Sequence, residues 1–342
     1  MADSAPPRRA TIRDVAAAAG VSVKTVSHAV NGKGEVDPTT RARVLAEAER
    51  LGYRASRSAR ALRGARTATI ALLMPSYGAT DREMLSLSYY MVVATAAASE
   101  AFALDHALLL APTVERQEDL RRLEVDGVVI CDPVAEDPRI DLFAAQGVPV
   151  VTIERDPARS GQRWWVAGDN REATEALLDH LSAAGAQRIA LLAADADADR
   201  GWTADSVAAY RAWCDAHGAE PLLARTSLHD LEHSAREQAT ALLRGPDRPD
   251  AIVALAERHA AGVVHAARAL NLSIPGDLLV ASGIDSPETR YGDPAITALD
   301  LHPDRRGAAA VRLLVERLQD QAPDPCQTIP AELRVRTSTS IA

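Results

Sequence analysis

One side of a short helix, expected over residues 23–30, carries residue types that contact DNA. They are a small apolar side chain, an ammonium, a hydroxyl and an imidazole: Val23, Lys24, Ser27 and His28. The opposite side carries Val26, Ala29 and Val30, which would pack against a neighbouring helix. A helix-turn-helix has this division, with one face that packs and one that enters the major groove and reads base edges. The spacing therefore predicts a DNA-binding element.

Two further helices are expected to hold that element in place. Residues 12–19 have apolar positions at helical spacing, and Gly20 follows where a left-handed residue ends a helix. Ser22 can cap the helix over 23–30. A third helix is expected over 38–51, with one apolar face made by Val44, Leu45, Ala48 and Leu51. Three such helices can close a small bundle, although an ordinary helical hairpin is the alternative for the first two.

The charge of the chain is divided unevenly along its length. The 342 residues carry a net charge of −9, which taken alone argues against nucleic acid. Residues 1–66, however, hold 13 Lys and Arg against 6 Asp and Glu, a net charge of +7, while the remainder holds 25 against 41, a net charge of −16. A basic head on an acidic body places the polyanion-binding surface at the N-terminus.

The motifs of this head resemble one known family. Residues 11–31 read T-I-R-D-V-A-x-x-A-G-V-S-x-x-T-V-S-H-x-x-N, followed by L-G-Y at 51–53 and S-A-R-A-L-R at 58–63. This pattern resembles the lactose-repressor (LacI) family, and T-V-S-H resembles the purine-repressor form of its recognition helix. The resemblance extends, more loosely, over nearly the whole chain. It implies a sequence-specific transcriptional regulator, a repressor, which binds a palindromic DNA operator as a homodimer.

The resemblance also implies individual DNA contacts within a headpiece over residues 10–55. Val23, Lys24 and His28 occupy the family's base-reading positions, where they would contact a thymine methyl, guanine O6 and N7, and a purine N7. A second group suits phosphate contacts, which position the protein without specifying sequence: Thr11, Thr25, Ser27 and Asn31.

Residues 56–66 are expected to form a hinge helix and linker. In the family this helix orders mainly on the operator, and Leu62 matches the leucine that wedges into the minor groove. Arg60 and Arg63 would hold the phosphates while the apolar tip unstacks a base step. The alternative is a solvated basic linker with an incidental leucine.

From residue 67 to residue 342 the pattern alternates between strands and helices. Helices are expected, among others, over 89–103, 117–125, 206–217, 235–244 and 307–319, and the last strand over 332–339. Repeated strand-then-helix units predict parallel sheets covered on both faces. About ten strands exceed what one sheet usually carries, so two lobes are expected, divided near 158–168 with crossovers near 286–302. With the resemblance, the expected fold is an all-α helix-turn-helix head and an α/β two-lobed periplasmic-binding-protein-like body.

Parallel sheets bind ligands beyond the carboxyl ends of their strands. That rule, with the family's own pattern, selects the candidate effector-binding residues: Ser76, Tyr77, Asp132, Glu154, Arg155, Asp169, Trp202, Glu257 and Asp285. Carboxylates can accept the hydroxyl hydrogen bonds of a polyol, and a tryptophan face can stack on a sugar ring. For each residue the alternative is a loop side chain that caps the next helix.

Three departures from the family pattern affect this cleft. Ser206, which is also a candidate effector-binding residue, stands where members commonly carry an arginine that anchors the ligand. Ala256-Glu257 replaces an Asn-Asp pair, and residues 76–86 replace the usual N-P-F-F segment. The expected effector is a small molecule, a sugar or related metabolite, unlike ribose, galactose or purine. A partner protein, or no effector at all, are the alternatives, and the sequence does not tell an inducer from a corepressor.

Catalysis, cofactors and metals are not expected. Cys131, Cys214 and Cys326 are scattered and expected to be reduced thiols. The nine histidines are also scattered, and the pair that stands four residues apart, His229 and His233, is not expected to be a zinc site. No nucleotide-binding or hydrolase motif occurs in the strand and helix context that it requires, which argues against an enzyme. The first ten residues do not read as a signal peptide and no run reaches membrane-spanning length, so a cytoplasmic protein is expected rather than a secreted sugar-binding one.

Overall fold

A computed structural model describes residues 10–30, 36–53, 67–75, 87–111, 117–120, 122–194, 201–227, 230–321 and 324–340. The chain divides into two compact units, Met1–Thr67 and Ala68–Ala342. We call them the headpiece and the body and describe each by itself. Within the described ranges, no helix has the length and apolar character needed to cross a membrane.

The described residues of the headpiece form three helices: α1 (Ile12–Ala19), α2 (Val23–Val30) and α3 (Pro38–Arg50). Thr11 and Asp14 form a capping box at the start of α1, and Gly20 ends it in the left-handed region at φ 63°. Ser22 Oγ accepts a hydrogen bond from the Thr25 amide at 3.1 Å, which caps α2 as predicted.

A small apolar core closes this bundle. Val15, Val26 and Val44, one from each helix, are 0% exposed. Leu45 departs from the expectation that it shares the inner face of α3, because its side chain is 46% exposed. The inward stripe follows Val44 and Ala48 at i, i+4 spacing, and the next residue along the helix is rotated about 100° away from it.

The described residues of the body form two six-stranded sheets, one in each lobe. The first has the order β11-β5-β4-β3-β1-β2 and all of its pairs are parallel. Its strands are β1 (Thr69–Leu73), β2 (Ala107–Ala111), β3 (Gly127–Cys131), β4 (Val150–Ile153), β5 (Trp165–Ala167) and β11 (Cys326–Thr328). This lobe also carries α6 (Ser88–Ala103), α7 (Gln117–Leu120), α8 (Pro138–Ala145) and α14 (Pro303–Leu318).

The second sheet has the order β12-β10-β9-β8-β6-β7, in which only β12 runs antiparallel, against β10. Its strands are β6 (Ile189–Ala194), β7 (Leu222–Thr226), β8 (Ala251–Ala254), β9 (Leu279–Ser282), β10 (Thr297–Asp300) and β12 (Glu332–Arg334). The helices of this lobe are α9 (Asn170–Ala183), α10 (Gly201–His217), α11 (Leu231–Arg244), α12 (His259–Ala269) and α13 (Pro287–Tyr291).

Two expected elements are shorter in the structure. The helix expected over 117–125 ends at Leu120, and the strand expected over 332–339 ends at Arg334, after which a 3-10 turn covers Thr337–Thr339. The sheets also contain β5, β10 and β11, which were not expected. Each of these has only three or four residues, too few for a periodic pattern to stand out.

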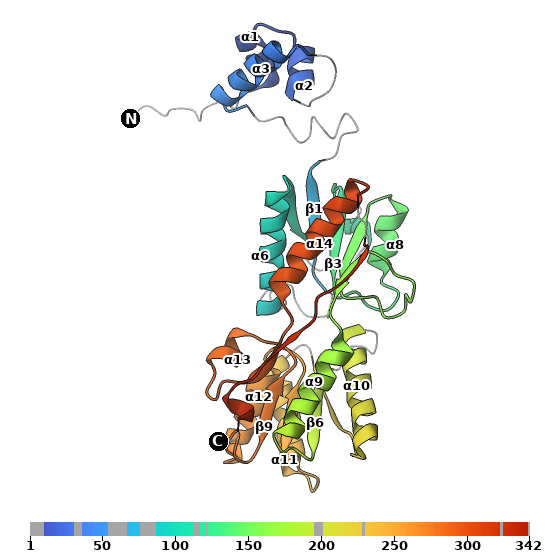
Figure 1. Ribbon diagram of the computed structural model, residues 1–342, viewed down its shortest axis with the longest axis vertical. Helices are drawn as coiled ribbons and strands as arrows, with labels where there is room; N and C mark the ends of the chain where they lie inside the picture. The colour runs from blue at the N-terminus through green and yellow to red at the C-terminus, as the bar shows by residue number, and fades with distance from the viewer. Residues whose placement is uncertain are drawn as a thin grey trace, which may run out of the picture. The chain divides into compact units, whose positions relative to one another are not determined.

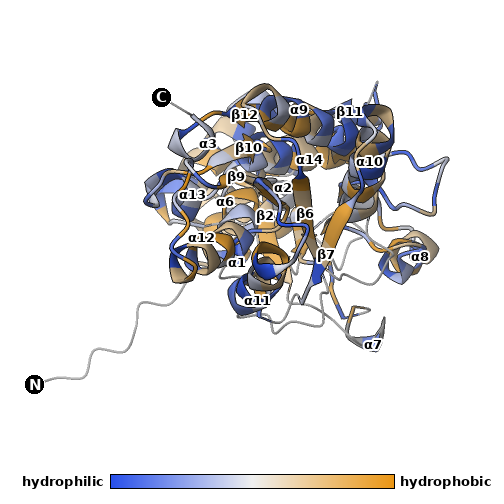
Figure 2. Ribbon diagram, turned by 90° about the horizontal axis from the view of Figure 1, so that it is seen from below, coloured by the Kyte–Doolittle hydropathy of each residue, from blue (hydrophilic) through white to orange (hydrophobic). Residues whose placement is uncertain are grey.

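Alternate side chains of each strand point to opposite helix layers. In the first lobe, Leu72 and Val129 face α6 and α14, whereas Leu73 and Val128 face α8. Figure 1 shows α6 and α14 side by side over one face of this sheet. In the second lobe α9 and α10 cover one face and α11 and α12 the other, and Figure 2 shows the hydrophobic colouring of β6 between them. Burial on both faces explains the continuous apolar runs of these strands.

The chain crosses between the lobes at three places. It leaves the first lobe after β5, at Gly168 and Asp169, and returns at Leu301 and His302, between β10 and α14. The third crossing lies between β11 and β12, over residues 329–331, and was not expected. The three crossings bring the carboxyl ends of the two parallel sheets to face each other, where they enclose the inter-lobe cleft.

Candidate functional site

Helix α2 presents the predicted base-reading side chains outward. Val23 is 40% exposed, Lys24 is exposed and His28 is half-buried, while Val26 and Ala29 of the same helix are buried in the bundle. Because the inner face is occupied by packing, the outer face is left for a ligand. This is the arrangement that recognition by a helix in the major groove requires.

The predicted phosphate contacts are placed less uniformly. Thr11 donates its hydroxyl to the Asp14 carboxylate at 2.7 Å, and the hydroxyl of Thr25 lies 2.8 Å from that of Ser22. Ser27 corrects the expectation that it shares the open face, because it is 8% exposed and turned toward the bundle. It lies one position after Val26 and two before Ala29, both of which are core residues. Asn31, Arg60, Leu62 and Arg63 lie outside the described residues.

The inter-lobe cleft is a cavity of about 100 Å³ lined by both lobes. It brings together five of the predicted effector-binding residues: Asp132, Glu154, Trp202, Ser206 and Glu257. The remaining lining is mostly apolar and includes Leu87, Leu231, Leu255, Ile284, Leu299 and Leu301. Ser76 and Tyr77 lie outside the described residues.

A buried ion pair lies on one wall of this cleft. Arg306, in the first turn of α14, is 1% exposed, and its Nη1 donates to Glu154 Oε1 at 2.5 Å. The same carboxylate accepts hydrogen bonds from Asn170 Nδ2 at 3.0 Å and from the Gly168 amide at 3.4 Å. Burial by itself would lower the pKa of Arg306, but the acidic groups of Tyr89 and Glu154 outweigh it and the pKa is raised.

Gly168 makes room for this arginine. A Cβ at Gly168 would lie 2.2 Å from Arg306 Nη2, so any larger residue would displace the guanidinium. Arg306 Nε and Nη2 are buried without a hydrogen-bond partner, while Nη1 also lies 3.4 Å from the Tyr89 hydroxyl. The guanidinium is therefore sealed between the ion pair and the first crossing of the chain.

Glu257 joins the two lobes through the start of a helix. It follows β8 in the second lobe, and its carboxylate accepts hydrogen bonds from the backbone amides of Ser88 at 2.7 Å and Tyr89 at 3.1 Å. These amides open α6 of the first lobe, whose own N-cap residue, Leu87, supplies no side-chain cap. Glu257 thus caps a helix of the opposite lobe, where the positive end of the helix dipole stabilises a carboxylate.

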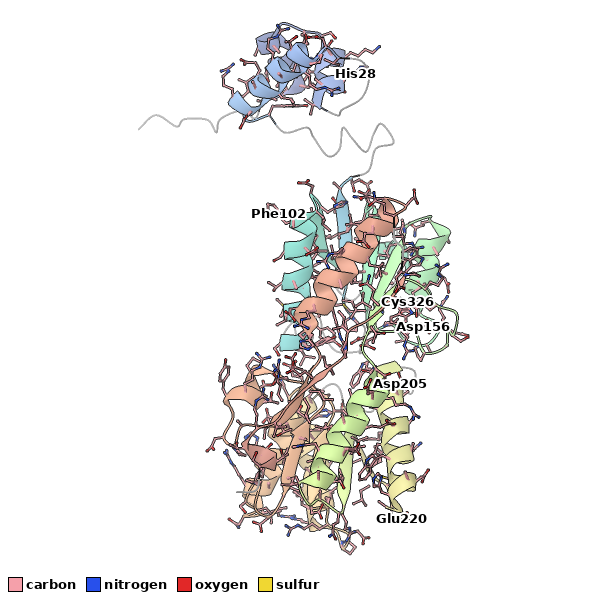
Figure 3. All side chains as sticks on the ribbon, viewed as in Figure 1. His28, Phe102, Asp156, Asp205, Glu220 and Cys326 are labelled. Carbon is pink, nitrogen blue, oxygen red and sulfur yellow. The ribbon has the colours of Figure 1, made fainter. Side chains whose placement is uncertain are left out.

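Another inter-lobe contact involves α10. Asp205 lies 3.6 Å from Arg155, which follows β4 of the first lobe. A Cβ at Gly201, the first residue of α10, would lie 3.0 Å from the Arg155 carbonyl oxygen, so the helix starts close against the other lobe. Figure 3 places Asp205 at the level where the lobes meet. Burial raises the pKa of Asp205.

Three predicted effector residues are not part of the cleft lining. Arg155 pairs with Asp205 and lies over the ring of Trp165 at 5.7 Å. Asp169 caps α9 by accepting a hydrogen bond from the Glu172 amide at 2.9 Å. Asp285 accepts hydrogen bonds from Arg290 and pairs with Arg336, each at 2.9 Å. For Asp169, the structure shows the alternative given above, a strand-end side chain that caps the next helix.

Sequence reasoning missed Arg306, Asn170 and Tyr89, which also line the cleft. Nothing in the local pattern separates Arg306 from the exposed Arg305 beside it. The one available signal was Gly307, because a glycine inside a long helix indicates a close approach of another element. A Cβ there would lie 2.4 Å from the Val93 carbonyl oxygen of α6.

The described lining of the cleft offers hydrogen-bonding groups and apolar surface. Among the residues that the structure describes, no cluster of three or more His, Cys, Asp or Glu side chains could hold a metal ion. Cys131 and Cys214 are buried thiols, and burial raises the pKa of each. A raised pKa keeps a thiol protonated and unreactive at neutral pH.

Two family descriptions match the chain. Residues 11–56 match bacterial regulatory proteins of the lacI family, and residues 178–339 match the periplasmic binding protein-like domain. The first match covers the headpiece helices, and the second covers the second lobe with α14 and β11 of the first.

Curated relatives match over nearly their whole length and are transcriptional regulators. The regulator MalR of Streptomyces coelicolor is 30% identical over 357 residues, covering 97% of each chain. The regulator CelR of Thermobifida fusca is 28% identical over 345 residues, covering 97% of this chain and 98% of its own. Catabolite control protein A of Priestia megaterium is 26% identical over 338 residues, covering 96% and 99%.

Solved structures show the same architecture. A lac repressor dimer, bound to its operator and to the anti-inducer ONPF, superposes with a TM-score of 0.81 at 25% identity, covering 97% of this chain and 99% of that one. The complex of the regulator CelR with cellobiose superposes with a TM-score of 0.69 at 26% identity, covering 96% and 100%.

Proposed function

This chain belongs to the lacI family of bacterial regulatory proteins, and from that premise we propose that it is a repressor controlled by a small molecule. In this proposal a homodimer binds a palindromic operator in the cytoplasm, and the effector binds in the inter-lobe cleft. One observation carries the DNA-binding part: α2 exposes Val23 and Lys24 and half-exposes His28 while its other face is sealed in the headpiece core.

The reading chemistry follows from the side chains. The Lys24 ammonium can donate to guanine O6 and N7, the Val23 methyls can contact a thymine methyl, and a His28 ring nitrogen can donate to a purine N7. One headpiece buries little surface and would bind weakly, so two copies on adjacent half-sites are needed for useful affinity. Leu62 is proposed to kink the centre of the operator as a minor-groove wedge, with Arg60 and Arg63 on the flanking phosphates.

Selection of bound sites from a random duplex library, by the purified chain at a stated salt concentration, tests this function. We expect enrichment of a palindrome of roughly 14–20 base pairs with a C·G-type central step. A palindrome supports the dimer, and the central step supports the wedge. Enrichment of a non-palindromic site, or of nothing with or without small-molecule extracts, would contradict the proposal.

Lys24→Ala tests the reading face within the same experiment. The variant is expected to relax base preference at one position of each half-site, because each good bidentate contact discriminates by about 1–3 kcal/mol. Arg43→Ala, at an exposed position of α3 away from this face, is the matched control. An unchanged preference profile for Lys24→Ala would remove that side chain from the base-reading set.

A second copy of this chain is the proposed occupant of an exposed apolar surface on the first lobe. On this side, helix α6 and strand β2 expose four large apolar side chains by 38–82%: Met91, Val92, Phe102 and Leu110. Figure 3 shows Phe102 on the outer side of α6. The similar lac repressor was solved as a dimer on its operator, which supports this choice. Val92→Glu with Phe102→Glu should shift sedimentation toward monomer, whereas Val335→Glu, 53% exposed elsewhere, should not.

The effector part of the proposal rests on the cleft between the lobes. The similar CelR was solved with cellobiose, which supports a small molecule between the lobes of this chain. A ligand shifts operator affinity only by the difference in its own affinity for the two states of the protein. Operator titrations with and without a ligand that binds the cleft give the sign, and hence inducer or corepressor.

A further inference from the structure

We infer that the cleft takes a ligand with an apolar ring and no negative charge, rather than a polyhydroxylated or phosphorylated sugar. The inference rests on the proposed role of the cleft as the effector site and names the class of its ligand. It follows from the hydrogen-bond partners that the carboxylates of the cleft already have and from the charge of the lining.

Each carboxylate that lines the cleft is engaged within the protein. Glu154 accepts from Arg306, Asn170 and the Gly168 amide. Glu257 accepts from the two amides that open α6, and Asp132 accepts a short hydrogen bond from the Tyr90 hydroxyl. A sugar hydroxyl could use these oxygens only by displacing a partner, and each buried donor left without an acceptor costs free energy.

Among the described residues, the lining of the cleft also carries more negative than positive charge. Among the described residues that line it, three carboxylates face one guanidinium, that of Arg306. Arg306 Nη1 is committed to Glu154 and Nη2 lies close to Gly168, while Nε and Nη2 are buried without a hydrogen-bond partner. An entering carboxylate or phosphate would therefore lose its hydration and meet like charge in a medium of low polarity, which opposes binding.

The surface that remains is mostly apolar, and its polar groups are the Ser206 hydroxyl and the unpaired N–H groups of Trp202 and Arg306. Six aliphatic side chains surround the cavity: Leu87, Leu231, Leu255, Ile284, Leu299 and Leu301. Trp202 adds an aromatic ring, and Ser206 adds a buried hydroxyl. Apolar pockets with one or two polar groups bind ring compounds through area burial and use the polar group for orientation.

A matched set of small compounds tests separately whether the cleft prefers an apolar ring, the absence of negative charge and the absence of a polyol. Benzyl alcohol, benzylamine and benzoate share one ring and differ in charge, and glucose supplies the polyol. Saturation-transfer NMR titrations of the full chain give the dissociation constant of each. We expect benzyl alcohol and benzylamine to bind. The dissociation constant of benzoate should be at least about tenfold higher, and glucose should give no signal over the same concentration range.

Substitutions place the binding in the cleft and test the charge argument. Ala173→Trp and Leu231→Trp each fill the cavity from a different helix and should abolish the benzyl alcohol signal, with operator binding as the control for folding. Glu257→Gln removes one negative charge from the cleft and should reduce the difference in affinity between benzyl alcohol and benzoate. Glu237→Gln, whose side chain is 64% exposed on α11, should leave that difference unchanged.

Three results would overturn the inference: no binding of benzyl alcohol, binding of glucose or benzoate as tight as that of benzyl alcohol, or an unchanged signal in both filled variants. The failure of the proposed function is a separate result. If the protein selects a palindrome but prefers glucose, only the inferred ligand class is wrong. If it selects no operator under any condition, the proposed function is wrong.

Discussion

Arg306 and Glu154 show how a buried charge can be tolerated without being a strong source of stability. Removing two charges from water costs several kcal/mol for each ion, and the pair returns that cost only through close geometry and further hydrogen bonds. The 2.5 Å contact and the donors from Asn170 and Gly168 supply both. Removal of one partner should therefore lower the free energy of unfolding far more than removal of both.

Arg306→Met should lower the free energy of unfolding of the body by about 3–5 kcal/mol, because Glu154 would remain buried without its counter-ion. Adding Glu154→Leu should recover most of this loss. Urea unfolding, followed by the fluorescence of the four tryptophans, all of which lie in the body, measures it. Arg312→Met, in the exposed pair with Glu100, is the control and should cost less than about 1 kcal/mol. A double variant no more stable than the single one would contradict this account.

His259 gives a pH dependence with a defined sign. Its imidazole is fully buried, and burial lowers its pKa to about 3, against about 6.5 in an unfolded chain. The unfolded chain therefore binds a proton first, and stability falls as pH drops below about 6.5, with a slope of up to about 1.4 kcal/mol per pH unit, until pH reaches about 3. Above pH 6.5 this group contributes no slope.

Comparison of wild type with His259→Gln measures that contribution directly. Between pH 7 and pH 5 the wild-type chain should lose about 2 kcal/mol more of its unfolding free energy than the variant, whatever the absolute stability of each. Urea titrations at the two pH values are sufficient. Equal losses would mean that the imidazole becomes protonated in the folded state.

The sequence predicted part of this site for a physical reason. Asp132, Glu154 and Glu257 follow strands, and parallel strands end at a common edge, so their position in the cleft could be anticipated. Arg306 could not, because its position depends on the chain returning to the first lobe just before α14. Whether a strand-end carboxylate binds a ligand or caps a helix, as Asp169 does, depends on contacts that a sequence pattern does not encode.

Among the elements, α14 carries much of the packing of the first lobe. It lies against α6, and Gly307 permits their close approach, since a Cβ there would lie 2.4 Å from the Val93 carbonyl oxygen. Long amphipathic helices such as this one were predicted from apolar spacing alone. The short strands β5, β10 and β11 were not, because their pairing partners rather than their own residues define them.

Gly307→Ala should force α14 away from α6 and lower the unfolding free energy of the body by about 1–3 kcal/mol, the usual cost of overpacking a core. Gly161→Ala is the matched control, because a Cβ at Gly161 would meet nothing within 4 Å. That variant should stay within about 0.5 kcal/mol of wild type. Equal effects in urea unfolding would show that α14 can move without cost.

At the scale of the whole molecule, charge is divided between the two units. The first 66 residues carry +7 and the rest −16, so attraction to a polyanion is confined to the head while the body repels it. This division predicts DNA binding that depends strongly on salt. It also predicts that the body suppresses non-specific contacts.

If two heads neutralise about 6–10 phosphates, operator affinity should fall by roughly 10³–10⁵ between 50 mM and 200 mM salt. Fluorescence-anisotropy titrations over that range give the slope of log affinity against log salt. Random DNA of the same length is the control and should show a similar slope at lower affinity. A flat slope on both duplexes would contradict phosphate contact by the basic head.

The hydrogen bonds that Glu257 accepts from the amides at the start of α6 affect how fast a ligand can bind. They fasten the two lobes across a cavity of about 100 Å³, so they must break before a ligand can enter. In stopped-flow experiments the observed association rate should then rise with ligand concentration and level off at the opening rate of the lobes. Glu257 would thus set how quickly a cell carrying this regulator can respond to a new molecule.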